Sequence, residues 1–282
     1  FSVSISPDRS RNANEMHIEL ATQKPLKKVS FLEIPETHFI EAKFLERVFL
    51  GRPLEVKRIP IDSFKIIEKG IEYLPYNSKI QNVYIGDYRI SERIFWFGTD
   101  KYGRDLLSRI LHGTRISLSV GFISVLISLI IGISLGLVAG YFRGIVDNII
   151  MWFVNVIWSI PTLLMVIAIT LALGKGFWQV FLAIGLTMWV EVARVVRGQV
   201  LVMRELEFVE AGKALAYNPF RIIFRHILPN VIGPVIVISA ANFSAAILIE
   251  SGLSFLGIGA QPPVPSWGAM IKDHYNYIIL GE

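Results

Sequence analysis

The sequence predicts an all-α polytopic membrane protein that is preceded by a small polar region of the α+β class. The 282 residues are 53% hydrophobic, with a mean hydropathy of +0.52, and only 18% are charged, whereas soluble domains carry about 25%. The charges are also unevenly placed: residues 1–95 hold 15 Lys or Arg and 13 Asp or Glu, and residues 96–282 hold 13 and 10. We therefore expect a polar region over residues 1–95 and a transmembrane domain over residues 96–282.

The polar region contains no long apolar run. Residues 54–77 mix β-branched and charged residues in short alternation, which is typical of strands. Residues 38–51 space their apolar residues as a helix does. This combination predicts a small α+β domain.

Four apolar segments are long enough to cross a bilayer, whose core needs about 20 apolar residues. They cover about residues 116–142, 147–174, 176–196 and 227–257. The first contains no charged residue, and Pro161 is expected to bend or loosen the second.

A stripe of small residues lies along one face of the first predicted span. Its members follow one another at steps of three or four residues: Ser117, Gly121, Ser124, Ser128, Gly132, Gly136 and Gly140. Lipid gives helices no hydrophobic reason to associate, so close backbone approach at small residues supplies much of the packing. We expect the stripe, and Gly121, Gly132, Gly136 and Gly140 above all, to face a partner helix of this chain or another.

The Lys and Arg residues predict the orientation in the membrane. Residues 197–226 are rich in both and Arg143 follows the first span, so the positive-inside rule places both in the cytoplasm and Lys175 outside. Residues 1–110 are then extracytoplasmic, because an odd number of crossings separates them from Arg143. An outer region at the start needs an earlier span or a cleaved signal, so we expect a piece of a longer protein. The net charge of +5 fits basic cytoplasmic loops and indicates no nucleic-acid partner.

The sequence offers no motif for catalysis, a cofactor or a metal. It has no cysteine and no G-x-x-x-x-G-K-[ST] phosphate loop, so any ATP would have to be bound by another chain. Residues 132–136, "GISLG", match a nucleophile-elbow pattern but lie inside an apolar span, which favours helix packing. The five histidines are scattered without metal-binding spacing: His17, His38, His112, His226 and His274.

Two carboxylates fall within predicted spans, where a charge is costly and is by default a functional candidate. Glu250 lies in the fourth span and either lines a polar translocation path or pairs with a neighbouring helix. Glu191 lies near the predicted inner end of the third span, and the simpler interpretation is an interfacial residue beside Arg194, one turn further on.

A charged segment, residues 207–230, interrupts the apolar half of the chain: "EFVEAGKALAYNPFRIIFRHILPN". Its pattern predicts a short helix, a break at Asn218–Pro219, and a second helix from Phe220. Two helical pieces at a turn between spans make a compact docking surface. The alternative is a solvated amphipathic loop on the membrane face.

Residues 210–230 resemble the EAA loop of permease subunits of binding-protein-dependent ABC importers. Glu210 and Ala211 match the start of that motif, and Ile227 and Pro229 match its end. Gly212 stands where the second Ala is usual, and Ala216 stands where Gly is usual. The resemblance implies an ATPase-docking loop with these residues: Glu210, Ala211, Gly212, Lys213, Ala216, Asn218, Pro219, Ile227 and Pro229.

Two longer stretches, residues 97–121 and 253–271, resemble the C-type permease subunit of the dipeptide/oligopeptide/nickel ABC importer family. The resemblance covers residues 96–282. It implies a MetI-like type I importer transmembrane domain in the bacterial inner membrane, with the first and last spans of the family absent here. It also implies these partners: a second homologous permease subunit, two cytoplasmic ATP-binding subunits and an extracytoplasmic solute-binding protein.

The leading hypothesis is thus a permease subunit, not an enzyme, that couples ATP hydrolysis by its partners to uptake of peptides or similar solutes. The alternatives are a membrane-anchored receptor or enzyme acting through residues 1–95, and a secondary transporter that uses Glu250. Within the loop, the Gly212 and Ala216 exchange predicts a slightly longer first helix, because Ala resists the left-handed geometry in which Gly ends it.

Overall fold

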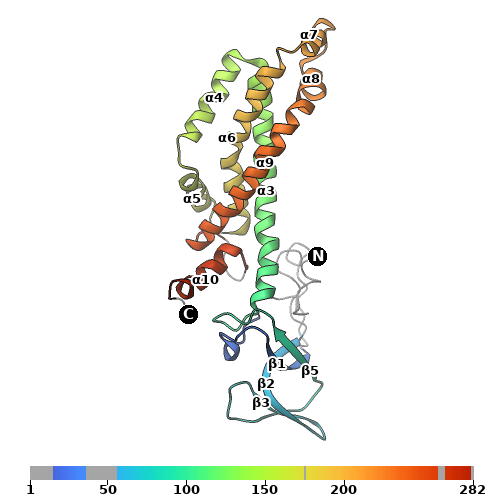
Figure 1. Cartoon of the computed structure of the whole chain (residues 1–282), viewed down its shortest axis with the longest axis vertical. Helices are drawn as coiled ribbons and strands as arrows, with labels where there is room; N and C mark the ends of the chain where they lie inside the picture. Colours follow the sequence, from blue (N-terminus) through green and yellow to red (C-terminus); the bar gives the residue numbers. More distant parts are fainter. Residues whose placement is uncertain (1–14, 36–55, 175, 260–263, 281–282) are drawn as a thin grey trace. The chain divides into compact units, whose positions relative to one another are not determined.

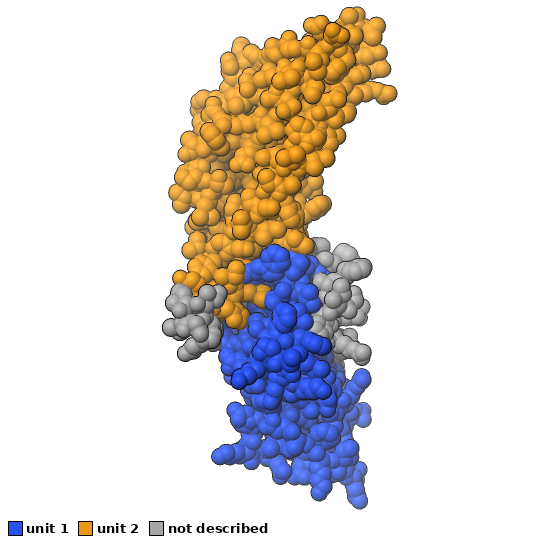
Figure 2. All heavy atoms as spheres, in the orientation of Figure 1, with its two compact units in different colours: residues 1–116, 262–267 blue, residues 117–261, 268–282 orange. Residues whose placement is uncertain are grey.

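The computed structural model describes residues 15–35, 56–174, 176–259 and 264–280. The chain forms two compact units, which Figure 2 colours separately. Unit 1 comprises residues 1–116 and 262–267, and unit 2 comprises residues 117–261 and 268–282. Each unit is described by itself.

Unit 1 contains a five-stranded sheet in the order β4-β3-β2-β1-β5, with every neighbouring pair antiparallel. The strands expected over residues 54–77 are present as β2 and β3, while the helix expected over residues 38–51 lies outside the described residues. Figure 1 shows the strands in blue to green. The elements are the 3-10 turn η1 (Ile18–Leu20), β1 (Lys27–Pro35), β2 (Val56–Ile67), β3 (Gly70–Pro75), β4 (Asn82–Tyr84) and β5 (Arg89–Phe95).

Alternation along β1 gives the sheet a core on each face. Successive side chains of a strand point to opposite faces, and the neighbours Phe31 and Leu32 are both fully buried. Phe31 packs with Leu20, Val29 and Phe95, whereas Leu32 packs with Ile61, Ile71 and Tyr73. The short alternation read from the sequence therefore reflects a sheet with apolar contacts on both sides.

Unit 2 is helical. Among the described residues, three helices are long and apolar enough to cross a membrane, or up to four if one bent pair counts as a span. The helices of the described chain are α3 (Leu106–Phe142, which begins in unit 1), α4 (Gly144–Trp158), α5 (Thr162–Leu173), α6 (Phe177–Met203), α7 (Glu207–Ala214), α8 (Pro219–Ile222), the π-helical η2 (Ile223–Ile227), α9 (Leu228–Phe255) and α10 (Trp267–Leu280).

The bent pair is α4 and α5, whose axes differ by 91°. The break falls at Ser159 to Pro161, where the proline ring lacks a backbone N–H and cannot continue the helical hydrogen bonds. The bend expected near Pro161 is therefore present as a complete interruption between two helices.

The small-residue stripe of α3 lies against α6 and α9 of the same chain. A Cβ added at Gly132, Gly136 or Gly140 would come within 2.5, 2.7 and 2.7 Å, respectively, of a valine Cβ on α6. The valines are Val192, Val196 and Val200 in that order. One added at Gly121 would come within 2.9 Å of the Phe243 ring on α9. These distances leave no room for a side chain, so the stripe lets two backbones approach closely.

Candidate functional site

The charged segment 207–230 forms α7, a tight turn, and then α8 and η2, which lead directly into α9 (Figure 1). Together, Pro219–Phe255 make one helical stretch. The segment therefore connects the end of α6 to a long apolar helix.

The turn after α7 is a Schellman motif closed by an alanine. Ala216 has a φ of +54°, the Tyr217 N–H donates to the Gly212 carbonyl at 3.0 Å, and the Ala216 N–H donates to the Lys213 carbonyl at 2.9 Å. This is the standard helix ending for which glycine is usual. The expected longer first helix is wrong: α7 ends at Ala214, because the two hydrogen bonds hold Ala216 in the left-handed conformation despite its Cβ.

Asn218 and Pro219 start the second helical piece rather than ending the first. The Asn218 side chain accepts a hydrogen bond from the Phe220 N–H at 3.0 Å, and Pro219 occupies the first turn of α8. Further on, Pro229 has no N–H for the preceding turn, which is widened into the π-helical η2. The side chain of Asn230 donates to the His226 carbonyl at 2.6 Å, so a carbonyl in this turn keeps a partner.

The inner side of the loop is apolar and packs against three helices. Val209 of α7 and Ile227 of η2 are fully buried, and Gly212 is buried beside them. They belong to a cluster that reaches α3, α6 and α9: Leu137, Tyr141, Val192, Val196, Val200, Val209, Ile222, Ile223, Ile227, Val231 and Val235. A displacement of α7 or α8 would therefore be transmitted to the long helices through side chains in contact.

The outer side of the loop is exposed and mixes charges with large apolar side chains. Among the residues expected to dock, Glu210, Ala211 and Lys213 are exposed. Beside them, four large apolar side chains are 39–66% exposed: Phe208, Leu215, Phe220 and Phe224. The ring of Tyr217 contacts two basic side chains: the guanidinium of Arg221 lies 4.1 Å from its centroid, and the His226 ring is stacked on it with centroids 6.1 Å apart. This surface suits a protein partner better than water alone.

Ion pairs that the sequence analysis missed join the helices next to the loop. Arg197 of α6 donates two hydrogen bonds to Asp147 of α4, at 2.5 and 2.6 Å. Arg143 pairs with Glu205 at 2.6 Å, and Arg204 donates to the Tyr141 carbonyl. The sequence could have indicated that Asp147 forms an ion pair, because a carboxylate at the start of an apolar helix needs a partner.

The two glutamates that the sequence places within predicted spans, Glu250 and Glu191, differ in their surroundings. Glu250 is 1% exposed and accepts a hydrogen bond from Ser254 at 2.6 Å. Glu191 is exposed, and its expected position near the inner end of a span stays a prediction. Glu191 lies near the middle of α6, and Arg194, one turn further on, bonds Asn155 at 2.6 Å and covers the Trp158 ring.

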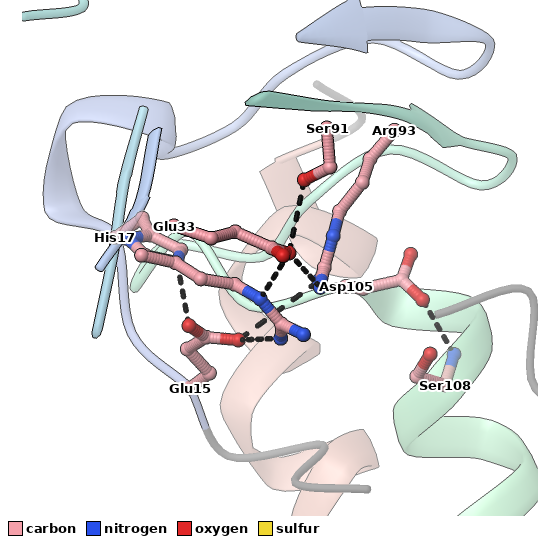
Figure 3. A network of polar contacts seen from close by, with 8 residues as sticks. Glu15, His17, Glu33, Ser91, Arg93, Asp105 and Ser108 are labelled. Carbon is pink, nitrogen blue, oxygen red and sulfur yellow. Dashed lines mark hydrogen bonds and ion pairs between the residues drawn. The ribbon is translucent and has the colours of Figure 1, made fainter. Parts of the chain in front are cut away.

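Unit 1 carries a polar network on its sheet (Figure 3). Arg58 donates to Glu15 at 3.0 Å and to Glu33 at 2.9 Å, and Ser91 also donates to Glu33 at 2.9 Å. Burial raises the pKa of Glu15, but the hydrogen bond from His17 and the charges of Arg58, His17 and Arg93 outweigh it and leave that pKa below its ordinary value. Across the described ranges, no group of acidic, His or Cys side chains is arranged to hold a metal ion.

Helices that are long and apolar enough to cross a membrane, with an exposed polar loop between two of them, define a membrane protein. The family described as "Binding-protein-dependent transport system inner membrane component" matches residues 132–281, which include this loop. The chain belongs to that family.

Curated relatives narrow the group. The chain is 43% identical over 185 residues to the glutathione transport system permease protein GsiD of Pectobacterium atrosepticum, covering 66% of this chain and 62% of that protein. It is 45% identical over 187 residues to the dipeptide transport system permease protein DppC of Bacillus subtilis, covering 66% and 58%. The oligopeptide transport system permease protein OppC of the same organism is 39% identical, covering 63% and 58%. The chain thus spans about 60% of the length of these relatives, and they are the C-type subunits that residues 97–121 and 253–271 predict.

A solved structure supports the fold. The MetNI methionine ABC transporter, in inward-facing conformations, aligns with a TM-score of 0.50 and 19% identity, covering 61% of this chain and 82% of that chain. Unit 2 therefore has the MetI-like type I importer fold expected from the sequence.

Proposed function

We propose that the chain is a permease subunit of an ATP-driven importer for peptides or similar small solutes, glutathione among them. The observation that carries the proposal is the exposed α7–α8 surface, which lies over a buried cluster shared with α3, α6 and α9. The relatives that transport dipeptides, oligopeptides and glutathione support the solute class.

In this proposal the loop transmits force from partner subunits that bind ATP. Two cytoplasmic ATP-binding subunits close on ATP and press on the exposed side of α7 and α8. The rigid turn at Ala216 keeps the two pieces at a fixed angle, and Val209 and Ile227 pass the displacement to the spanning helices. A second homologous permease subunit completes the path.

The same proposal sets the topology. The loop and Arg143 face the cytoplasm of a bacterial inner membrane, and residues 1–110 lie outside, where an extracytoplasmic solute-binding protein delivers its cargo. The basic residues beside the loop support this orientation by the positive-inside rule. The secondary-transporter alternative depended on Glu250, whose buried hydrogen bond to Ser254 favours a packing role.

The test is a charge reversal at Glu210 in the assembled transporter, reconstituted in liposomes with its partners. Glu210→Arg should abolish stimulation of the ATPase and stop uptake. Glu19→Arg is the matched control, because it reverses the charge of an exposed glutamate in unit 1, outside the docking loop. Unchanged transport by Glu210→Arg would refute the docking role.

A further inference from the structure

A cavity of about 200 Å³ lies in unit 2 where the α4–α5 break meets α6 and α9. Figure 1 shows α4 and α5 joined through this break, beside α6. The wall is mostly apolar, but it includes the hydroxyl residues Thr162 and Thr187 and one ionisable residue, Glu191. The remaining lining residues are Ile157, Trp158, Ile160, Met188, Val190, Ala245 and Ile249.

The position of Glu191 along its helix makes it unusual. It lies near the middle of α6 (Phe177–Met203), roughly 20 Å from either end at 1.5 Å per residue. Its side chain is exposed on unit 2. Glu191 also lines the cavity, and a carboxylate within an apolar helix is by default a functional candidate that faces a polar path or a charged partner.

No such partner for Glu191 occurs among the residues that the structure describes. The nearest basic residue along the helix, Arg194, is engaged by the Asn155 side chain and the Trp158 ring. Two other carboxylates of the apolar helices do have partners: Glu250 accepts a hydrogen bond from Ser254, and Asp147 pairs with Arg197.

We propose that Glu191 and this cavity form a binding site on the solute path. The site binds a primary ammonium group, such as the amino terminus of a peptide-like solute. The inference rests on the proposed function. Pockets that enclose whole drug-sized ligands measure about 300–1,000 Å³, so this cavity holds one end of a solute. The break between α4 and α5 lies at this cavity, and interrupted helices are a feature of transporter binding sites.

The test compares two solutes in the assembled transporter, reconstituted with saturating binding protein. One is a dipeptide with a free amino terminus, and the other is the same dipeptide N-acetylated. Glu191→Gln should slow uptake of the free dipeptide roughly tenfold to a hundredfold, the range expected for a lost hydrogen bond to a charged group. Uptake of the acetylated dipeptide should not change, and Glu191→Asp should retain part of the free-dipeptide rate.

The other outcomes overturn the inference in distinguishable ways. Equal loss for both dipeptides assigns Glu191 a structural role, and loss of the second permease subunit on purification of Glu191→Gln assigns it to a subunit interface. No effect removes it from the path. Glu19→Gln, an exposed carboxylate of unit 1, is the control. If the unaltered assembly shows no ATP-dependent uptake at all, the proposed function fails instead.

Discussion

Unit 1 is stabilised by buried polar side chains, whereas unit 2 uses small residues to bring helices into close contact. Unit 1 encloses a network of charged side chains, in which Arg58 and Glu33 are 8% and 13% exposed. Unit 2 instead brings α3 and α6 together at glycines with no room for a Cβ. A sheet domain in water gains from burying side chains, whereas helices in lipid gain from backbone contact. The residues that matter for stability therefore differ in kind between the units.

The largest effect is expected from removing the central cation of unit 1. Arg58→Met leaves Glu15 and Glu33 without their closest partner, and breaking a buried pair costs about 3–5 kcal/mol. We expect the lower end, because Arg93 remains 3.9 and 3.8 Å from those carboxylates. Lys57→Met, the exposed neighbour on β2, should change stability by less than about 0.5 kcal/mol. Hydrogen exchange of β1 and β5 measures both, and equal protection in the two variants would contradict the role of the network.

The second prediction concerns the glycines of α3. Gly136→Ala places a Cβ 2.7 Å from that of Val196 and 2.8 Å from the Ala193 carbonyl oxygen. Overpacking of this kind costs about 1–3 kcal/mol, and should lower the thermal unfolding midpoint in detergent. Gly198→Ala is the control, because nothing lies within 4 Å of its added Cβ. An unchanged midpoint for Gly136→Ala would show that α3 and α6 can separate freely.

The sequence predicted the close-packed stripe but not the partner helix. Spacing alone places Gly132, Gly136 and Gly140 on one face. It does not tell which helix faces them, since every span of this chain is apolar. The valines of α6 recur at the same step of four, which is recognisable only once the two helices are paired.

The loop shows a second limit of prediction from sequence. The start of α8 could be predicted from Asn218–Pro219. The end of α7 could not be predicted from residue preferences. Glycine is favoured at Ala216, yet the turn forms there because its hydrogen bonds, the burial of Gly212 and the partial burial of Tyr217 outweigh the strain.

The third prediction concerns Gly212 and Ala216, which stand in the loop where Ala and Gly are usual. Ala216→Gly should stabilise the turn by about 1 kcal/mol, since Ala in the left-handed region costs roughly that much. Gly212→Ala should add about 0.5–1 kcal/mol, because its Cβ would lie 3.6 Å from Ile222 and Tyr217, at ordinary contact distance. Ala214→Gly, in the last residue of α7, should destabilise instead. Unfolding midpoints measure all three, and destabilisation by Ala216→Gly would contradict the turn geometry.

The smallest effect is expected from Glu15 and depends on pH. Its pKa lies below the ordinary value of 4.5 in the folded unit, so it contributes stability that is complete above pH 4.5 and is lost as the pH falls through the lowered pKa. Glu15→Gln should therefore lower the unfolding midpoint of the protein at neutral pH, and the difference should shrink as the medium is acidified below 4.5. A difference between Glu15→Gln and the unaltered protein that grows on acidification would mean that burial, rather than the surrounding arginines and His17, controls this carboxylate.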